Sequence, residues 1–290
     1  MDEFKLKLIQ LTSISGIGWK TICKMLNEDP NLKNVNCSTL KELSSPFVKS
    51  PQAVNLKDTL HPESIYEQIR QYSLNGIKTI TIFDKEYPAL LKETYQPPWV
   101  IYAKGDLSLL QNKELLAVVG SRQHSDYGEN AINYLFPPLI EKGIVIVSGL
   151  AAGIDTAAHH AAIKCGGKTI GVIAGGFYHI YPHTNKNLAC EMMKSHLLLS
   201  EYPPDTKPTR WQFPMRNRII SGISKGTLIV QAKKKSGSLI TANFAVQEGR
   251  EVFALPGNIF SPYSSGTNEL IQQGAKLVST PEDILEEFIY

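Results

Sequence analysis

Short runs of aliphatic and β-branched residues alternate with amphipathic stretches along most of the chain, from about Ile77 onward. Each run predicts a strand, and the amphipathic stretches between the runs predict helices. Such alternation is typical of βαβ units, so we expect an α/β domain with a mainly parallel sheet. The predicted strands are Lys78–Phe83, Val100–Tyr102, Leu115–Val119, Ile144–Val147, Thr169–Ile173, Leu197–Leu199, Thr227–Val230, Val252–Leu255 and Lys276–Val278. The clearest predicted helices are Ile154–Lys164, Lys186–Lys194, Phe213–Ser221, Leu239–Glu248 and Glu282–Phe288.

The N-terminal part of the chain follows a different pattern. Apolar residues such as Leu8, Leu11 and Ile22 recur there at helical spacing, and glycines and prolines interrupt them. We therefore predict a small all-helical domain at residues 1–60, followed by the α/β domain at residues 61–290.

Two adjacent prolines, Pro137 and Pro138, fall in the stretch that should form the helix after the strand ending at Val119. Proline lacks the backbone N–H and its ring clashes with the preceding turn. We expect this helix to be kinked or split at that point.

Composition indicates a folded protein. The chain has 290 residues, of which 42% are hydrophobic and 20% charged, so it can bury a sizeable core and is not disordered as a whole. The N-terminus has no basic segment followed by an apolar one, and no later stretch could cross a bilayer, so we expect a cytoplasmic protein without membrane contact. The four cysteines are widely spaced and have no histidine at ligand spacing, so we predict structural thiols and no metal site.

Charge is informative only locally, because the overall net charge is just +3. Between Asp205 and Lys235, eight basic residues stand against one acid, a local net charge of +7. After Phe244 the sign reverses, with seven acids against two basic residues, a net charge of −5. This asymmetry indicates a polyanion on one side of the fold and a different partner on the other.

Glycine-containing loops follow three consecutive predicted strands. Ligands of open α/β sheets bind where strands end, because helix N-termini there present free amides and a positive dipole. Any one of these loops could be a simple turn, but three on successive strands favour a binding site. The candidate residues in these loops are Gly120, Ser121 and Arg122 in the first, Ser148, Gly149 and Gly153 in the second, and His183, Asn185 and Lys186 in the third.

Two further basic loops precede helices. We expect the loops together to form a positive, amide-lined trough for several phosphates in a row. A crevice at strand ends admits a flexible single strand better than a duplex, and Trp211, Phe177 and Tyr181 could stack on unpaired bases, although core packing explains these aromatics equally well. The additional candidates are Arg210 in the first of these loops, Arg216, Asn217 and Arg218 near the start of the helix that follows it, and Lys235, Ser236, Gly237 and Ser238 at the second loop.

The common enzyme motifs are absent. The first glycine loop, after Leu115–Val119, has no G-x-G-x-x-G dinucleotide-binding motif. The sequence also has no complete P-loop, no G-x-S-x-G elbow and no histidine pair at metal-ligand spacing. We therefore expect no cofactor, no metal and no catalysis.

The motifs closely resemble those of the DNA-processing protein A family, also called DprA or Smf. The resemblance runs from about Ile77 to the C-terminus, with the motifs in the family's order and spacing. The residues that carry it are Asp84–Pro88, Pro97–Gly105, Val119–Arg122, Ser148–Asp155, Phe213–Gly222, Lys235–Ala242 and Ala254–Gly257.

This resemblance implies an extended Rossmann-like fold that binds single-stranded DNA without base specificity. It also implies a homodimer that helps load RecA recombinase onto incoming strands during natural transformation, with no nucleotide cofactor. By motif matching, the family's DNA-contacting arginine falls on Arg122, and its Arg-Asn-Arg helix start falls on Arg216–Arg218. The chain departs from the family at His183, where members often carry a basic residue.

The ends of the chain also resemble parts of the family. The N-terminal segment is similar to a SAM-like helical domain, and Ile14–Gly18 resembles a helix-hairpin-helix turn. Leu270, Ile271 and Leu277 are candidates for the dimer contact, although burial within one subunit explains them equally well.

A second hypothesis is a hydrolase or sensor of nucleotide derivatives. Pro256–Gly257 and Gly266–Glu269 loosely resemble the pattern of a related Rossmann-like group of that kind. Such an enzyme needs one small pocket and a catalytic carboxylate, whereas the charge run favours a longer trough.

Overall fold

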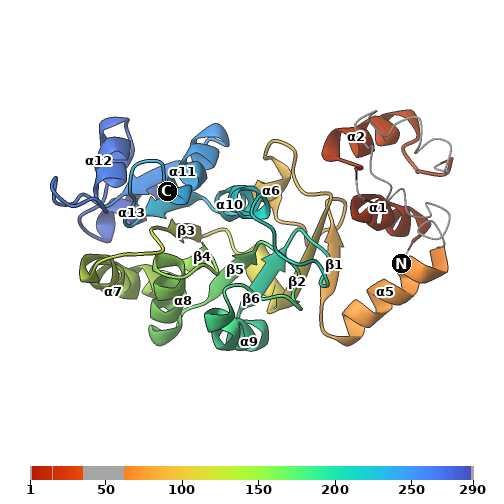
Figure 1. Cartoon of the computed structure of the whole chain (residues 1–290), viewed down its shortest axis with the longest axis horizontal. Helices are drawn as coiled ribbons and strands as arrows, with labels where there is room; N and C mark the ends of the chain where they lie inside the picture. The colour runs from red at the N-terminus through yellow and green to blue at the C-terminus, as the bar shows by residue number, and fades with distance from the viewer. Residues whose placement is uncertain (1, 15, 35–61, 289–290) are drawn as a thin grey trace.

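A nine-stranded sheet forms the centre of the α/β part of this computed structural model, which describes residues 2–14, 16–34 and 62–288 (Figure 1). Its strands correspond one to one with the nine predicted from the sequence. They are β1 (Lys78–Thr81), β2 (Val100–Gly105), β3 (Leu115–Val119), β4 (Val145–Gly149), β5 (Thr169–Ile173), β6 (Leu197–Ser200), β7 (Gly226–Ile229), β8 (Glu251–Ala254) and β9 (Lys276–Leu277).

The strand order in the sheet is β1-β2-β6-β5-β4-β3-β7-β8-β9. The seven neighbouring strands β6-β5-β4-β3-β7-β8-β9 pair in parallel. β1 and β2 add an antiparallel edge beside β6. The prediction of a mainly parallel sheet is confirmed. Because β4 lies on one side of β3 and β7 on the other, the chain reverses its direction of winding at β3, which creates a switch point between β3 and β7.

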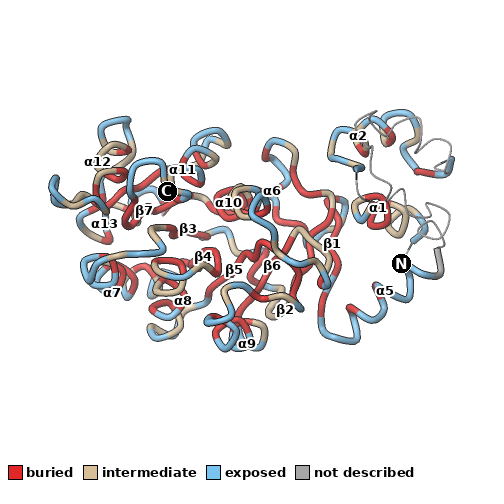
Figure 2. Tube along the Cα trace, viewed as in Figure 1, coloured by how far each residue is buried: buried red, intermediate tan, exposed pale blue. Residues whose placement is uncertain are grey.

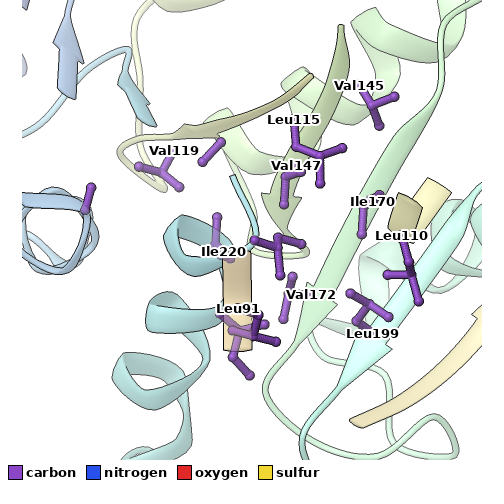
Figure 3. Close-up of a cluster of buried hydrophobic side chains, with 14 of the residues drawn as sticks. Leu91, Leu110, Leu115, Val119, Val145, Val147, Ile170, Val172, Leu199 and Ile220 are labelled. Carbon is purple, nitrogen blue, oxygen red and sulfur yellow. The ribbon is translucent and has the colours of Figure 1, made fainter. Parts of the chain in front are cut away.

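Helices cover both faces of the sheet, and side chains alternate between two buried layers. Leu115, Ala117 and Val119 of β3 point into one layer, whereas Leu116 and Val118 point into the other. Figure 3 shows part of the first layer, with strand residues packed against helical ones, and Figure 2 shows the strands buried beneath exposed outer loops. The first layer is covered by α6 (Ala89–Lys92), α10 (Gln212–Gly222), α11 (Gly237–Gln247) and α12 (Ser265–Gln272). The opposite face is covered by α7 (Asp126–Glu141), α8 (Ile154–Lys164), α9 (Lys186–Ser195) and α13 (Glu282–Phe288).

The N-terminal helices lie beyond the β1 edge of the sheet (Figure 1). They are α1 (Glu3–Ser13), α2 (Trp19–Glu28) and α5 (Pro62–Leu74). Leu8 and Ile22 form a small core of their own against Trp99, while Ile9 joins Ile69 of α5 in a cluster that extends under the sheet. The predicted domain boundary near residue 60 lies outside the described residues.

The helix that carries Pro137 and Pro138 is not split. α7 runs without a break over Asp126–Glu141. Pro137 is exposed and Pro138 half-buried, whereas Ile132 and Leu139 on the other side are fully buried against the sheet. Burial of this apolar face outweighs the hydrogen bonds that the two prolines remove.

Candidate nucleic-acid interface

An open cleft of about 740 Å³ lies at the switch point between the carboxyl ends of β3 and β7. Loops from five parallel strands and the first turns of α10 and α11 form its walls. The position is the one at which open α/β sheets bind their ligands. The residues that line it are Val119, Gly120, Ser121, Arg122, Gln123, Ala151, Asp155, Tyr181, Arg210, Phe213, Pro214, Arg216, Asn217, Lys233, Ser236, Gly237, Ser238, Ile240 and Thr241.

The loop after β3 is fixed from both sides. The Ser121 amide donates to the Gln231 carbonyl at 2.8 Å, and the Ile154 amide donates to the Ser121 carbonyl at 3.2 Å. Gly153 precedes α8 with φ +84°, and a Cβ atom there would overlap the carbonyl oxygens of Ser121 and Arg122. The glycine is therefore required for the close approach of the two loops.

Arg122 projects into the cleft as an exposed side chain. Its guanidinium lies over the Phe213 ring, 5.6 Å from the centroid, and Tyr181 packs edge-on against Phe213 at 5.7 Å. The contact holds the charge in place without neutralising it. Arg122 makes no ion pair with any described residue, so its donors are available to an anion.

Arg216 forms the floor of the cleft and is only 5% exposed. Its Nη1 donates to the Val172 carbonyl at 2.7 Å, and its Nη2 lies 3.9 Å from Oδ2 of Asp155. Burial raises the pKa of the Asp155 carboxyl, and the charge of Arg216 opposes that rise. A Cβ atom at Gly149 would overlap both partners, so this glycine leaves the space in which they meet.

The N-terminus of α11 faces the same cleft. Ser236 is its N-cap in an extended conformation and makes no side-chain cap hydrogen bond, and Gly237 and Ser238 follow in the first turn. Asn217 ties α10 to this turn, because its Nδ2 donates to the Gly237 carbonyl at 3.2 Å. The first amides of a helix have no partner within the helix and carry its positive dipole, which suits a phosphate.

The cleft is electropositive. Its lining contains four cations, Arg122, Arg210, Arg216 and Lys233, and one carboxylate, Asp155, so its net charge is +3. That carboxylate is already paired with a buried arginine. A ligand with several negative charges is therefore favoured.

Some predicted site residues lie elsewhere. Arg218 pairs with Glu201 and faces a second hollow, which Trp19 of α2, Tyr202 and Trp211 also line. Lys235 faces a third hollow next to the cleft, which is lined by Lys234, Lys235, Ser236, Leu239, Ile240, Asn243, Gly266, Glu269, Leu270 and Gln273. His183 and Lys186 are exposed but do not line the cleft.

Other predicted residues support the site from inside. Asn185 is buried, and its Nδ2 donates to the Leu150 carbonyl at 2.9 Å. The buried Ser148 hydroxyl donates to the Val118 carbonyl at 2.6 Å. These residues shape the loops and present no free donor to a ligand.

The three aromatic candidates for base stacking differ in exposure and in whether they line the cleft. Phe177 is buried in the cluster beneath α9, so the interpretation as a stacking residue is wrong for it. Tyr181 is exposed and lines the cleft. Trp211 is also exposed, but it contacts Tyr202 at the second hollow.

Sequence reasoning missed the Asp155–Arg216 pair and left Lys233 and Phe213 out of the site. Gln212, Arg216, Ile219 and Ile220 share the inward stripe of α10, and all are buried. This spacing is visible in the sequence and could have shown that Arg216 faces inward. No local signal pairs it with Asp155.

The candidates for a dimer contact do not form one exposed surface. Leu270 is buried in the subunit core and Ile271 packs against it, whereas Leu277 is exposed. Dimerisation stays a prediction.

The pattern behind the hydrolase hypothesis has a structural role. Asn268 accepts from the Gly257 amide at 3.1 Å and donates to the Gly257 carbonyl at 3.0 Å, which joins the two halves of the pattern. Glu269 lies outside the cleft, at the third hollow. Within residues 2–14, 16–34 and 62–288, no three potential metal-ligating side chains gather at one point. None of the helices in these ranges is both long and apolar enough to span a membrane.

Comparisons with known proteins agree with this geometry. Residues 78–289 match the family model described as DNA recombination-mediator protein A. The DNA processing protein DprA of Bacillus subtilis is 48% identical over 266 residues, which cover 92% of this chain and 89% of that protein.

Two solved structures are similar over the sheet. The X-ray structure of DprA from Streptococcus pneumoniae matches with a TM-score of 0.86 and 38% identity, covering 100% of both chains. A Helicobacter pylori structure, which describes the single-stranded DNA binding mode of that organism's DNA processing protein A, matches with a TM-score of 0.67 and 30% identity. It covers 73% of this chain and 95% of the other. These matches confirm the predicted Rossmann-like α/β fold.

Proposed function

Because this chain belongs to the DNA recombination-mediator protein A family, we propose that it binds single-stranded DNA through the cleft between β3 and β7, independently of base sequence. The observation that carries the proposal is the gathering of Arg122, Arg216 and Lys233 with the N-terminus of α11 around one open cleft. The Helicobacter pylori relative, described as binding single-stranded DNA, supports the same ligand.

The chemistry of the cleft favours backbone phosphates over base edges. Its exposed donors are the side chains of Arg122, Arg210 and Lys233 and the amides of the first turn of α11. Such groups fix a phosphate backbone but carry no base-pair code. Tyr181 offers a ring on which any base can stack, which again is independent of sequence.

A cleft at strand ends fits a flexible strand better than a rigid duplex. The walls are loops from five neighbouring strands, and the floor is a buried ion pair. An unpaired strand can lower its phosphates toward that floor by rotating its backbone, whereas a duplex cannot.

Binding without catalysis is part of the proposal. The carboxylate of Asp155 in the cleft lies beneath Gly149 and opposite Arg216, which leaves it poorly placed to activate water. The alternative, a nucleotide-derivative hydrolase, needs a free carboxylate in the cleft, and Glu269 lies at a different hollow.

We further propose that the chain acts in the cytoplasm as a homodimer that helps load RecA recombinase onto single strands during natural transformation. This part rests on the family.

The direct experiment is equilibrium binding of labelled single-stranded and duplex oligonucleotides, each in several base compositions. We expect tight binding to every single strand and at least tenfold weaker binding to duplex. Preference for duplex, or binding to one base composition alone, would contradict the proposal.

The loading role needs a separate experiment. The purified chain is mixed with RecA, single strands coated with a single-strand binding protein, and a homologous duplex. We expect faster strand pairing than with RecA alone, and no stimulation would remove the loading role while leaving DNA binding intact.

A further inference from the structure

Two adjacent residues with large apolar side chains, Ile259 and Phe260, are exposed to solvent. Ile259 is 81% exposed and Phe260 is 88% exposed, and both lie in the loop between β8 and α12. We call these two residues the apolar tip. A tip of two adjacent exposed hydrophobic residues costs solvation free energy and therefore suggests a binding role.

The apolar tip is held in a defined position. The Phe260 amide donates to Oδ1 of Asn258 at 2.9 Å, and the Ala232 amide donates to the Tyr263 carbonyl at 2.8 Å. Asn268 secures the start of the loop through its two hydrogen bonds with Gly257. The two exposed side chains of the apolar tip therefore belong to a tethered loop.

These tethers place the tip beside the lysine loop, which we define as Lys233–Lys235. Lys233 lies 4.9 Å from the ring centroid of Tyr263 in the tip's own loop. Lys234 and Ile259 line one shallow hollow together. The two loops form one surface at the end of the molecule where α11 and α12 lie side by side (Figure 1).

This surface is continuous with the cleft. Ser236 lines both the cleft and the third hollow, and Lys234 lines both the third hollow and the hollow that holds Ile259. A path of hollows thus leads from the N-terminus of α11 over Lys234 and Lys235 to the apolar tip.

The net charge along this path is positive. None of the ion pairs among the described residues includes Lys234 or Lys235. Glu269 is the acid that lines the same hollows, so two lysines face one carboxylate.

We propose that the apolar tip is a second contact for the single strand, in which a base that leaves the cleft over Lys234 and Lys235 stacks on the ring of Phe260. This inference rests on the proposed function and extends it to a strand longer than the cleft. An exposed aromatic ring beside cations that follow a backbone is the arrangement by which proteins hold unpaired strands.

Charge favours this occupant over a second copy of the chain. A symmetric contact through the tip would bring the two lysine loops toward each other, and the repulsion between them would oppose burial. A polynucleotide instead neutralises the lysines and covers the ring at the same time.

The test compares Phe260→Ala with the unchanged chain on two oligothymidylates, one of about 4 nucleotides that fills only the cleft and one of about 20 that extends past it. We expect about 5- to 100-fold weaker binding of the long oligonucleotide, the range that loss of one stacked base gives, and unchanged binding of the short one. Phe260→Trp should restore tight binding. Because stacking neutralises no phosphate, the salt dependence should stay the same.

Tyr134→Ala is the matched control, because Tyr134 is a 58% exposed aromatic on α7, away from the path. It should change neither affinity. Equal effects of Phe260→Ala on both oligonucleotides, or no effect on either, would overturn the inference. A change confined to the sedimentation coefficient of the protein would also overturn it, by assigning the tip to self-association. If the unchanged chain bound neither oligonucleotide, the proposed function itself would fail.

Discussion

Arg216 lies beneath the cleft with its Nη2 3.9 Å from Oδ2 of Asp155, and both groups are almost completely buried. The pair meets in a space that exists only because Gly149 has no side chain. A positive charge is thus held under the site by two elements far apart in the sequence, the first turn of α8 and the first turns of α10.

Gly149→Ala should destabilise the fold. The added methyl group would overlap the guanidinium of Arg216 and the carboxylate of Asp155, neither of which can move far inside the core. We expect a loss of about 2–4 kcal/mol in the free energy of unfolding, measured in urea. Gly18→Ala is the control, because nothing lies within 4 Å of a Cβ atom there, and it should change stability by less than about 0.5 kcal/mol. Equal stabilities of the two variants would show that the pair does not need Gly149.

The Asp155–Arg216 pair should behave as one unit. Asp155→Asn leaves the buried Arg216 charge without its partner and should cost about 3 kcal/mol of unfolding free energy. Adding Arg216→Met should recover part of that loss, because the unpaired charge disappears. A double-mutant cycle should therefore give a coupling of at least about 1 kcal/mol, and additive effects of the two changes would argue against a functional pair.

His159 should make the fold less stable in mild acid. Its Nε2 lies 2.6 Å from the Gly149 carbonyl and its Nδ1 lies 2.7 Å from the Thr169 hydroxyl. Burial lowers the pKa of His159 from 6.5 to about 4, so the unfolded chain takes up the proton first as the pH falls. This contribution to stability is complete above pH 6.5 and is lost progressively toward pH 4.

The measurement is the free energy of unfolding at pH 7 and pH 5 for the unchanged chain and for His159→Gln. The unchanged chain should lose about 2 kcal/mol more than the variant between these pH values. Comparing the two proteins cancels the contributions of the other titrating groups to the pH dependence. One of these groups is His196, because burial lowers its pKa as well. The same pH dependence in both proteins would show that His159 is not held neutral.

Much of the fold could be predicted because buried strands leave a strong signal. The central parallel strands β3, β4 and β5 are buried along their whole length, and β3 is the uninterrupted apolar run Leu115–Val119. Helix α12 had no such signal, since its eight residues include Ser265 and Gly266 and only part of it is buried. The continuity of α7 through Pro137 depends on tertiary packing that local rules do not contain.

The candidate site could be predicted only in outline. Loops after parallel strands must meet at one edge of a sheet, so the convergence of Gly120–Arg122 with Ser236–Ser238 was accessible from the sequence. Which charges face the cleft was not, because Arg216 and Arg218 are two residues apart on one helix and point to different sides. Counting the charges along the sequence does not show which side of a helix each charge faces.

The amides at the start of α11 should contribute directly to phosphate binding. Gly237→Pro removes one N–H at the first helical position, where proline fits and the preceding Ser236 is already extended. We expect about tenfold weaker binding of single strands with unchanged salt dependence, because the lost donor is uncharged. Gly237→Ala keeps the N–H in an open position and should bind normally. Equal binding by the two variants would exclude an amide contact at this residue.

The salt dependence of single-strand binding tests the cleft most directly, with Arg122→Gln compared to Lys142→Gln. Arg122 is an exposed cation of the cleft, while Lys142 is an exposed cation at the end of α7. Each phosphate contact on a single strand adds about 0.7 to the slope of log K against log salt. The slope should fall by about 0.7 for Arg122→Gln and stay unchanged for Lys142→Gln. An unchanged slope and affinity for Arg122→Gln would contradict the placement of the strand in the cleft.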